Sequence, residues 1–468
     1  MAYTNYIHRT PSSNGNRRTF TISTWVKRPE PKGQGWILTV DSYPSGNMFQ
    51  YQLDTASYFG LQQYHGNAVQ ASINTSNLLK DPNAWYHLVL RVDTTQSTAA
   101  DRVRLYINGT EATYNNPSYP SQNFEFQVNH VTKQSINSRE DTSSGESLYF
   151  SHYHLCDGYS YAPTEFGETD STTGQWKIKT EVSVSYGTNG FWIFKDGMNL
   201  SGSTVQDQSG QGNNLTLVGS SIETQDTPSN SFCTLNFANR SRITTDSSGD
   251  YLKQGNTTFD TSSSNGIKSI NTGTIGVQSG KYYWEYKVIT NTRLYVGITQ
   301  ENIMSFPQPY YDETDYSAIM MNLNGAITGR YTGSAIDEFS SGTSNTTNDI
   351  IGLALDMDNK AFYIHKNGTY ISNGSNVGVP TSGSSRTGSL IEGLAGSRDD
   401  YIPDGEFIFP VVMDASTSGV AKAEFNFGNG YFGTTAISSE GTNASGNGKF
   451  EYDVPAGYTA LCTKGLNA

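Results

Sequence analysis

Residues 349–371 read DIIGLALDMDNKAFYIHKNGTYI, and this stretch decides the fold. From Ile351 to Leu355, apolar residues alternate with small ones, a period of two that predicts a strand with one buried face. Residues 357–360, Met-Asp-Asn-Lys, predict a turn because Asp and Asn tolerate left-handed backbone angles. Asn367-Gly368 predicts a second tight turn, since this dipeptide suits two positive φ angles. The stretch is therefore predicted to be a three-stranded meander without a helix.

A second stretch with the same pattern lies at residues 85–110. Aromatic and apolar residues from Tyr86 to Val92 fall on one face of a predicted strand, and those from Val103 to Ile107 fall on the matching face of the next. This stretch also ends in Asn-Gly-Thr. The chain is therefore predicted to be all-β, with two jelly-roll-like antiparallel sandwiches that are each built around one meander.

The composition favours this fold class and limits the partners. Charged residues make up 16% of the 468 residues, whereas 47 Gly and 30 Tyr are typical of a protein with many turns and strands. The net charge is −13 and no run of Lys and Arg is longer than a pair, so we expect no nucleic-acid partner. No long apolar run is present, and residues 1–10 lack the features of a signal peptide. We therefore expect no membrane insertion.

The three cysteines are too few, and odd in number, for a secreted disulfide framework. We expect Cys156, Cys233 and Cys462 to be buried, reduced thiols. Cys233 and Cys462 lie in similar contexts, Phe-Cys-Thr-Leu and Leu-Cys-Thr-Lys, so we hypothesise that they are neighbours.

The first region resembles the laminin-G-like, concanavalin-type jelly roll. The matching segments are residues 20–26 (FTISTWV), 85–90 (WYHLVL) and 104–110 (RLYINGT). The resemblance covers about residues 15–165. It implies the fold and not a ligand, because the matching positions belong to the core and the turns.

The second region resembles the SPRY domain, which is also a jelly-roll-like sandwich. The matching features, in chain order, are Tyr-Tyr-Trp-Glu at 282–285, Val-Gly-Ile at 296–298, Gly-Leu-Ala-Leu-Asp at 352–356, Lys-Asn-Gly at 366–368 and Asn-Phe-Gly at 426–428. The resemblance covers about residues 245–435. It implies a protein-recognition scaffold whose loops vary.

The segments between and after these regions resemble virion proteins of tailed phages, especially those of marine bacteria. The resemblance lies in residues 147–200, 207–214 and 226–230 and in the tail at 446–463. We predict a laminin-G-like domain at 1–165, a Gly/Asn/Ser-rich ordered connector at 166–244, a SPRY-like domain at 245–435 and a tail at 436–468 that packs back.

This resemblance implies a structural subunit of a phage particle: a tail fibre, spike or surface-decoration protein. Such a subunit is expected to be made in the host cytoplasm, to assemble in the virion as a homo-oligomer, and to bind other virion proteins or host-surface glycan. The alternative is a free carbohydrate-binding protein or a concanavalin-fold glycan hydrolase.

A loop rich in aromatic residues is the predicted binding site. It contains Phe306, Tyr310, Tyr311 and Tyr316. Exposed tyrosines give rigid contact area to a sugar or a protein. The same rings could instead cap the end of the sandwich, and loop aromatics serve both purposes.

The acidic residues do not favour catalysis. Retaining glycoside hydrolysis needs two carboxyl groups about 5 Å apart. The candidates lie in residues 165–170 and 312–315, and neither set alternates within an apolar strand. We therefore expect no catalytic residues and no enzyme.

Two sets of residues could hold a metal ion. His152 and His154 are two apart and could chelate a transition metal from one face of a strand, although packed or exposed imidazoles are favoured. Calcium often accompanies laminin-G-like sandwiches, for which Asp41, Asp93 and Asp101 offer loop oxygens. The metal therefore stays unknown, with calcium as a candidate, and His87 is interpreted as structural.

Overall fold

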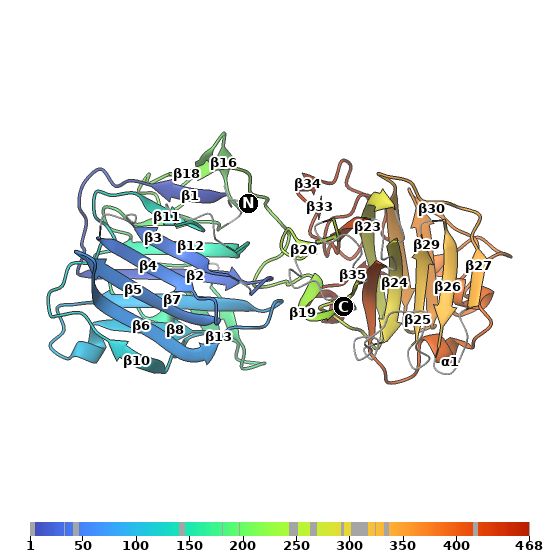
Figure 1. Cartoon of the computed structure of the whole chain (residues 1–468), viewed down its shortest axis with the longest axis horizontal. Coiled ribbons are helices and arrows are strands. Elements are labelled where there is room, and N and C mark those ends of the chain that lie inside the picture. Colours follow the sequence, from blue (N-terminus) through green and yellow to red (C-terminus); the bar gives the residue numbers. More distant parts are fainter. Residues whose placement is uncertain are drawn as a thin grey trace. The chain divides into compact units, whose positions relative to one another are not determined.

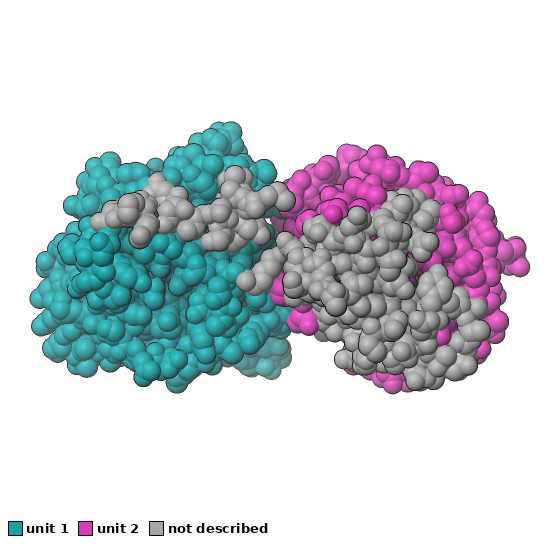
Figure 2. Space-filling model, viewed as in Figure 1, with its two compact units in different colours: residues 1–223, 227–229 teal, residues 224–226, 230–468 magenta. Residues whose placement is uncertain are grey.

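The computed structural model describes residues 5–467 apart from 32, 41–45, 140–145, 180, 196, 243–250, 263–268, 292–293, 301–316, 323, 332–336 and 415–419. The chain divides into two compact units (Figure 2). Unit 1 comprises residues 1–223 and 227–229, and unit 2 comprises residues 224–226 and 230–468. Both consist of antiparallel sheets with short helical turns (Figure 1), so the predicted all-β, two-sandwich fold is confirmed. No helix in the described ranges is long and apolar enough to cross a membrane.

Unit 1 is a sandwich of two sheets. One sheet has the order β10-β6-β5-β4-β3-β11-β1-β18-β17-β16, and the other has the order β15-β12-β2-β7-β8-β9. The strands of the first are β1 (Tyr6–Arg9), β3 (Gly35–Val40), β4 (Met48–Leu53), β5 (Tyr58–His65), β6 (Ala68–Leu78), β10 (Tyr114–Ser118), β11 (Gln134–Ile136), β16 (Leu200–Ser201), β17 (Thr204–Val205) and β18 (Leu215–Val218). Those of the second are β2 (Thr19–Lys27), β7 (Trp85–Asp93), β8 (Val103–Ile107), β9 (Thr110–Glu111), β12 (Tyr149–Asp157) and β15 (Phe191–Ile193). The remaining elements are η1 (Ala99–Asp101), η2 (Pro163–Glu165) and the pair β13 (Gly167–Thr169) and β14 (Trp176–Ile178).

Unit 2 repeats this plan. One sheet has the order β19-β22-β31-β24-β25-β26-β27, and the other has β20-β21-β32-β23-β28-β29-β30 with β35 parallel to β23. The strands of the first are β19 (Leu235–Arg242), β22 (Ser269–Gly273), β24 (Leu294–Gln300), β25 (Ala318–Asn322), β26 (Ala326–Arg330), β27 (Asp337–Ser340) and β31 (Ile408–Asp414). Those of the second are β20 (Leu252–Lys253), β21 (Thr258–Asp260), β23 (Lys281–Asn291), β28 (Ile350–Asp356), β29 (Ala361–Lys366), β30 (Thr369–Tyr370), β32 (Ala421–Asn426) and β35 (Thr459–Ala460). The remaining elements are β33 (Tyr431–Phe432), β34 (Thr435–Ala436), η4 (Pro380–Ser385), η5 (Leu390–Gly393), α1 (Arg398–Tyr401) and η6 (Gly465–Asn467).

The two predicted meanders form as expected, and their Asn-Gly turns are built alike. β28, β29 and β30 pair in sequence, as do β7, β8 and β9. Asn367 and Asn108 have φ of 49° and 48°, which matches the predicted positive angles. Each Asn also accepts a hydrogen bond on Oδ1 from the first neighbouring strand, from Ile350 N in one unit and His87 N in the other, both at 2.8 Å. The Asn side chain therefore extends the ladder of each hairpin by one bond.

In each unit, one sheet is covered on the face that points away from the sandwich core. In unit 1 a small cluster of Cys156, Phe166, Tyr186 and Trp192 lies on this face. In unit 2 the tail does the same, with Phe450 and Tyr458 packed on Tyr283 and Tyr363. These clusters are separate from the main sandwich cores.

Residues 166–244, which we assigned to a connector, supply strands to both units. β15, β16, β17 and β18 belong to the sheets of unit 1, and β19 begins unit 2 at Leu235. Strands β15 to β18 are too short to show a period of two, so periodicity alone does not distinguish them from loop.

The three cysteines are thiols, as the sequence predicts. Cys156, Cys233 and Cys462 are all free and buried. Cys233 N donates to Leu461 O at 2.9 Å, so Cys233 and Cys462 lie on adjacent segments. Their side chains belong to different clusters, the main core of unit 2 and the layer under the tail.

Candidate functional site

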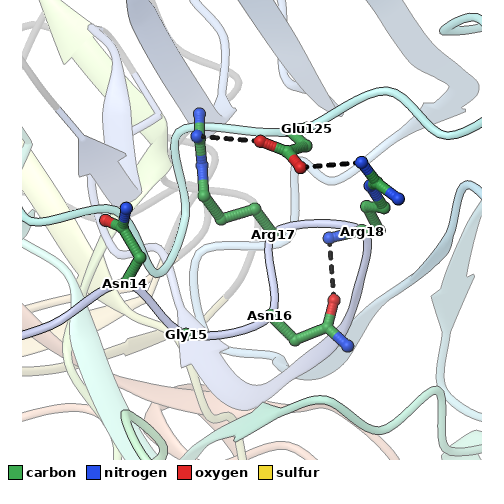
Figure 3. A pocket seen from close by; sticks show the side chains of 6 residues that line it. All are labelled: Asn14, Gly15, Asn16, Arg17, Arg18 and Glu125. Carbon is green, nitrogen blue, oxygen red and sulfur yellow. Dashed lines mark hydrogen bonds and ion pairs between the residues drawn. The ribbon is translucent and has the colours of Figure 1, made fainter.

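A polar pocket of about 300 Å³ opens on unit 1 at the loop between β1 and β2 (Figure 3). Its lining residues are Asn14, Gly15, Asn16, Arg17, Arg18 and Glu125. Five of these come from one short loop, and Glu125 reaches the pocket from the segment after β10.

The loop that lines the pocket is held in one conformation by its own amides. Asn16 Oδ1 accepts from the backbone N–H groups of Arg18 and Thr19, both at 2.9 Å, an Asx-type turn that leads into β2. Gly15 N donates to Asn129 O at 2.9 Å. A side chain at Gly15 does not fit, because a Cβ there would lie 2.3 Å from Asp157 Oδ2. The pocket therefore has a preformed floor.

Asp157, at the end of β12, anchors this floor from below. Its carboxylate is buried, with 4% of the residue exposed. Oδ1 accepts from Asn16 N at 2.7 Å and from Asn129 Nδ2 at 3.0 Å, and Oδ2 accepts from Asn189 N at 2.9 Å. Three N–H donors satisfy this carboxylate, and its charge also acts on the nearby Arg9 guanidinium.

An ion-pair cluster forms the side of the pocket. Arg17 Nη1 lies 3.2 Å from Glu125 Oε2, and Arg18 Nη2 lies 2.9 Å from Glu125 Oε1 (Figure 3). Arg17 Nε also donates to Phe126 O at 2.7 Å. Burial lowers the pKa of Arg17, which the Glu125 carboxylate partly offsets, and a guanidinium stays charged at neutral pH. Arg18 and Glu125 are about half exposed, so their charged ends can meet a ligand.

The two asparagines of the pocket use their amide oxygens as acceptors and leave their NH₂ groups unbonded among the described residues. Asn14 Oδ1 accepts from Val131 N at 3.0 Å, while Asn16 Oδ1 is used within the loop. Within the described part of the chain, neither Asn14 Nδ2 nor Asn16 Nδ2 has a hydrogen-bond partner. Amide, guanidinium and carboxylate groups arranged in this way can bind the hydroxyl, ring-oxygen or acidic groups of a saccharide.

The structure does not describe the binding residues predicted from the sequence. Phe306, Tyr310, Tyr311 and Tyr316 fall outside the described residues. The pocket itself was missed, because its parts come from places more than a hundred residues apart in the chain. The Asn-Gly-Asn run at 14–16, followed by two arginines, was the one local signal.

The histidine pair sits at a β-bulge and packs against aromatic rings. The pairing of β12 with β2 shifts register between Ser151 and His154, and His152 has φ 47°. His154 Nδ1 lies 2.9 Å from Tyr186 Oη, and its ring stacks on Trp192 at 4.8 Å between centroids. Burial keeps the pKa of His154 well below its usual value, so the imidazole is neutral.

The acidic residues that we considered for calcium have protein partners or are not described. Asp93 accepts from the backbone and side chain of Thr95 and from Gln96, and Asp101 pairs with Arg104. Asp41 lies outside the described residues. In the described ranges, no three His, Cys, Asp or Glu side chains are grouped to hold a metal ion.

His87 is a buried structural residue, in agreement with the sequence interpretation. Its ring stacks between Trp25 and Trp176, at 5.0 and 5.9 Å between centroids. Trp176 Nε1 donates to His87 Nδ1 at 3.0 Å, so the imidazole proton is on Nε2 and points to Ser23 Oγ at 2.8 Å.

One set of acidic residues considered for catalysis forms a surface ion-pair group. Lys177 Nζ lies 3.3 Å from Glu168 Oε1 and 3.1 Å from Asp170 Oδ2. Lys177 and Glu168 are about half exposed. The other set, residues 312–315, lies outside the described residues.

The fold and this pocket define a β-sandwich protein with a preformed polar recess. Residues 2–131 match the model of the Laminin_G_3 family, a concanavalin A-like lectin/glucanases superfamily. No curated protein is similar enough in sequence to count as a relative.

Several solved structures are similar to part or nearly all of the chain. The SPRY domain of human HERC1 is 20% identical, with 34% of this chain and 81% of that chain covered and a TM-score of 0.23. Domains LG4-5 of the mouse laminin alpha1 chain are 8% identical, with 97% and 93% covered and a TM-score of 0.27. A heptameric SAP-like pentraxin from Limulus polyphemus is 12% identical, with 35% and 74% covered and a TM-score of 0.25. At such low TM-scores these likenesses carry no conclusion about function.

Proposed function

We propose that the protein is a non-catalytic adhesion subunit of a tailed-phage particle, a tail fibre, spike or surface-decoration protein. Its first unit binds a host-surface glycan, and its second unit binds other virion proteins. The subunit is made in the host cytoplasm and assembles in the virion as a symmetric homo-oligomer. No cofactor is part of this proposal.

The observation that carries the glycan-binding part is the preformed pocket of unit 1. Its loop is fixed by Asp157 and by the Asn16 turn, so little conformational entropy is lost when a ligand binds. Its lining is polar, and it lies on the domain whose residues 2–131 match a lectin-containing superfamily. The phage part is supported by the sequence resemblance of the connector and tail segments.

A glycan array with the full chain tests the binding. We expect binding to a subset of bacterial surface glycans, and Arg18→Ala to reduce it, because Arg18 is half exposed at the pocket and anchors no backbone group by its side chain. Arg104→Ala is the matched control: Arg104 also pairs with exposed acids on unit 1 but does not line the pocket. No bound glycan, or equal binding by the Arg18 variant, contradicts the proposal.

Two further measurements test the remaining parts. Mass spectrometry of purified particles is expected to find this chain, and its absence from them contradicts a virion role. A reducing-sugar assay on the bound glycans is expected to show no turnover. Turnover that Glu168→Gln abolishes would instead establish a glycan hydrolase.

A further inference from the structure

We infer that the pocket selects saccharides that carry an oxyanion, either a carboxylate or a sulfate. This inference rests on the proposed glycan binding and names the chemical class of the ligand. It follows from which atoms of the pocket are already used and which remain.

The pocket is rich in donors and poor in acceptors. Both amide oxygens, those of Asn14 and Asn16, accept backbone N–H groups, so each amide presents its NH₂ group instead. Arg17 and Arg18 add guanidinium donors and have no acceptor atoms. Glu125 is the one acid among the six lining residues, and both of its oxygens already face an arginine. A ligand that supplies acceptors therefore fits better than one that supplies hydroxyl donors.

The charges of the lining agree with this count. Arg17 and Arg18 carry two positive charges against the single negative charge of Glu125, although the whole chain has a net charge of −13. A buried acid, Asp157, lies beneath Gly15, where its oxygens accept from N–H donors and its negative charge is opposed by the nearby Arg9 guanidinium. A recess with a net positive charge attracts an anion at short range, within a Debye length of about 10 Å at 0.1 M salt.

Glu125 competes with an anionic ligand for the guanidinium groups of Arg17 and Arg18. Its side chain is 48% exposed, so the carboxylate can turn toward solvent while a ligand oxyanion accepts from Arg18. The Asn14 amide, on the other side of Arg17 in Figure 3, then donates to a ring oxygen or a hydroxyl oxygen of the same sugar. Removing the charge of Glu125 is therefore expected to strengthen binding, an effect opposite to that of most pocket substitutions.

Three monosaccharides that share the glucose ring distinguish neutral, carboxylate and sulfate ligands: glucose, glucuronate and glucose 6-sulfate. Ligand-observed NMR with the full chain is expected to show that an anionic sugar binds at least about fivefold more tightly than glucose, the upper range of one exposed ion pair. Glucuronate and glucose 6-sulfate distinguish the carboxylate from the sulfate. Glucose binding as tightly as both anions overturns the inference and leaves glycan binding intact, whereas no glycan binding on the array removes the proposed function itself.

Variants of the pocket sharpen the test. Glu125→Gln is expected to raise the affinity for the preferred anion about threefold, and Arg18→Gln to lower it about fivefold. Asn14→Asp keeps an oxygen for Val131 N but replaces the free NH₂ by a charged oxygen, so it is expected to remove the preference for the anion. Arg104→Gln, away from the pocket, is the control for charge alone. Unchanged or weaker binding by Glu125→Gln, together with an unchanged preference in Asn14→Asp, contradicts the inference.

Discussion

Asp157 is a buried carboxylate whose partners are N–H groups of three different segments. Asn16, Asn129 and Asn189 donate to it, at 2.7 to 3.0 Å. Asp157→Asn keeps the shape but turns an NH₂ group toward at least one of these donors. Because an unsatisfied buried donor costs about 1–3 kcal/mol, we expect a loss of that size in the free energy of unfolding of unit 1, together with weaker glycan binding.

Chemical denaturation and the glycan array measure these two effects on the same sample. Asp101→Asn is the matched control, because Asp101 is a partly exposed acid paired with Arg104. Its expected effect is below about 1 kcal/mol. A variant at Asp157 as stable as the wild type would show that the loop does not depend on this carboxylate.

His87 links the stability of unit 1 to pH. Burial lowers its pKa from 6.5 to about 3. In the unfolded chain the imidazole takes up a proton below about pH 6.5, whereas in the folded chain it stays neutral until about pH 3. The unfolded state therefore binds more protons in this window, so the stability contributed by neutral His87 is present above pH 6.5 and is lost as pH falls.

We expect this residue alone to lower the free energy of unfolding by on the order of 3 kcal/mol between neutral pH and about pH 4. His154 and His365 act in the same direction, since burial lowers the pKa of both. Denaturant titrations at several pH values are expected to show a shallower pH dependence for His87→Gln than for the wild type. An identical slope in the two proteins would show that His87 is accessible to protons in the folded state.

At the scale of elements, each of the two covered sheets has an aromatic ring packed over the glycine of an Asn-Gly turn. In unit 1 the ring of Trp176 lies where a Cβ of Gly109 would be and stacks on His87. In unit 2 the ring of Tyr452 lies over Gly368, and it contacts the ring of His365 at 5.2 Å between centroids. The glycine of each Asn-Gly turn therefore permits the turn and also leaves room for an aromatic ring of the covering segment.

The tail of unit 2 is fastened by one buried carboxylate. Glu285 on β23 accepts from the backbone N–H groups of Glu451 and Tyr452, both at 2.9 Å, and from Tyr283 Oη at 2.9 Å. Burial raises its pKa from 4.5 to about 7. Between pH 4.5 and about 7, the folded state therefore keeps a proton on Glu285 that the unfolded state releases. The contribution of Glu285 to the free energy of unfolding falls as pH rises through about 7, opposite in sign to that of His87.

Glu285→Gln is expected to loosen the tail, because one of its oxygens becomes an NH₂ group that faces N–H donors. Loss of one such hydrogen bond corresponds to about tenfold faster exchange of the amide hydrogens at 449–460, measured by mass spectrometry. Glu440→Gln, an exposed acid of the same tail that pairs with Lys449, is the control and is expected to leave exchange unchanged. Unchanged exchange in Glu285→Gln would mean that ring packing alone holds the tail.

These elements also show what the sequence can and cannot predict. The meander at 349–371 was predicted in full, because alternation and Asn-Gly turns are local signals. The pocket was not, because Asp157, Asn129 and Asn189 meet through contacts between residues far apart in the chain. The short strands β15 to β18 were assigned to a connector for the same reason: their pairing partners, not their own sequence, make them strands.

At the scale of the whole molecule, the described residues of each unit form a main hydrophobic core and a smaller cluster. Those of unit 1 are formed by residues from Ile7 to Leu217, and those of unit 2 by residues from Phe232 to Cys462. Because cooperative unfolding follows a shared core, each unit is expected to unfold as one cooperative block.

We therefore expect two transitions in differential scanning calorimetry, one for each unit. Trp176→Ala removes the donor to His87 Nδ1 and the cover of Gly109, so it is expected to lower the transition of unit 1 and leave the other in place. Glu285→Gln is expected to do the reverse. The double variant is expected to show both shifts unchanged in size, since the effects of sites without shared partners add. A single transition that both substitutions lower equally would contradict independent blocks and would mean that adhesion by one unit is energetically coupled to the other.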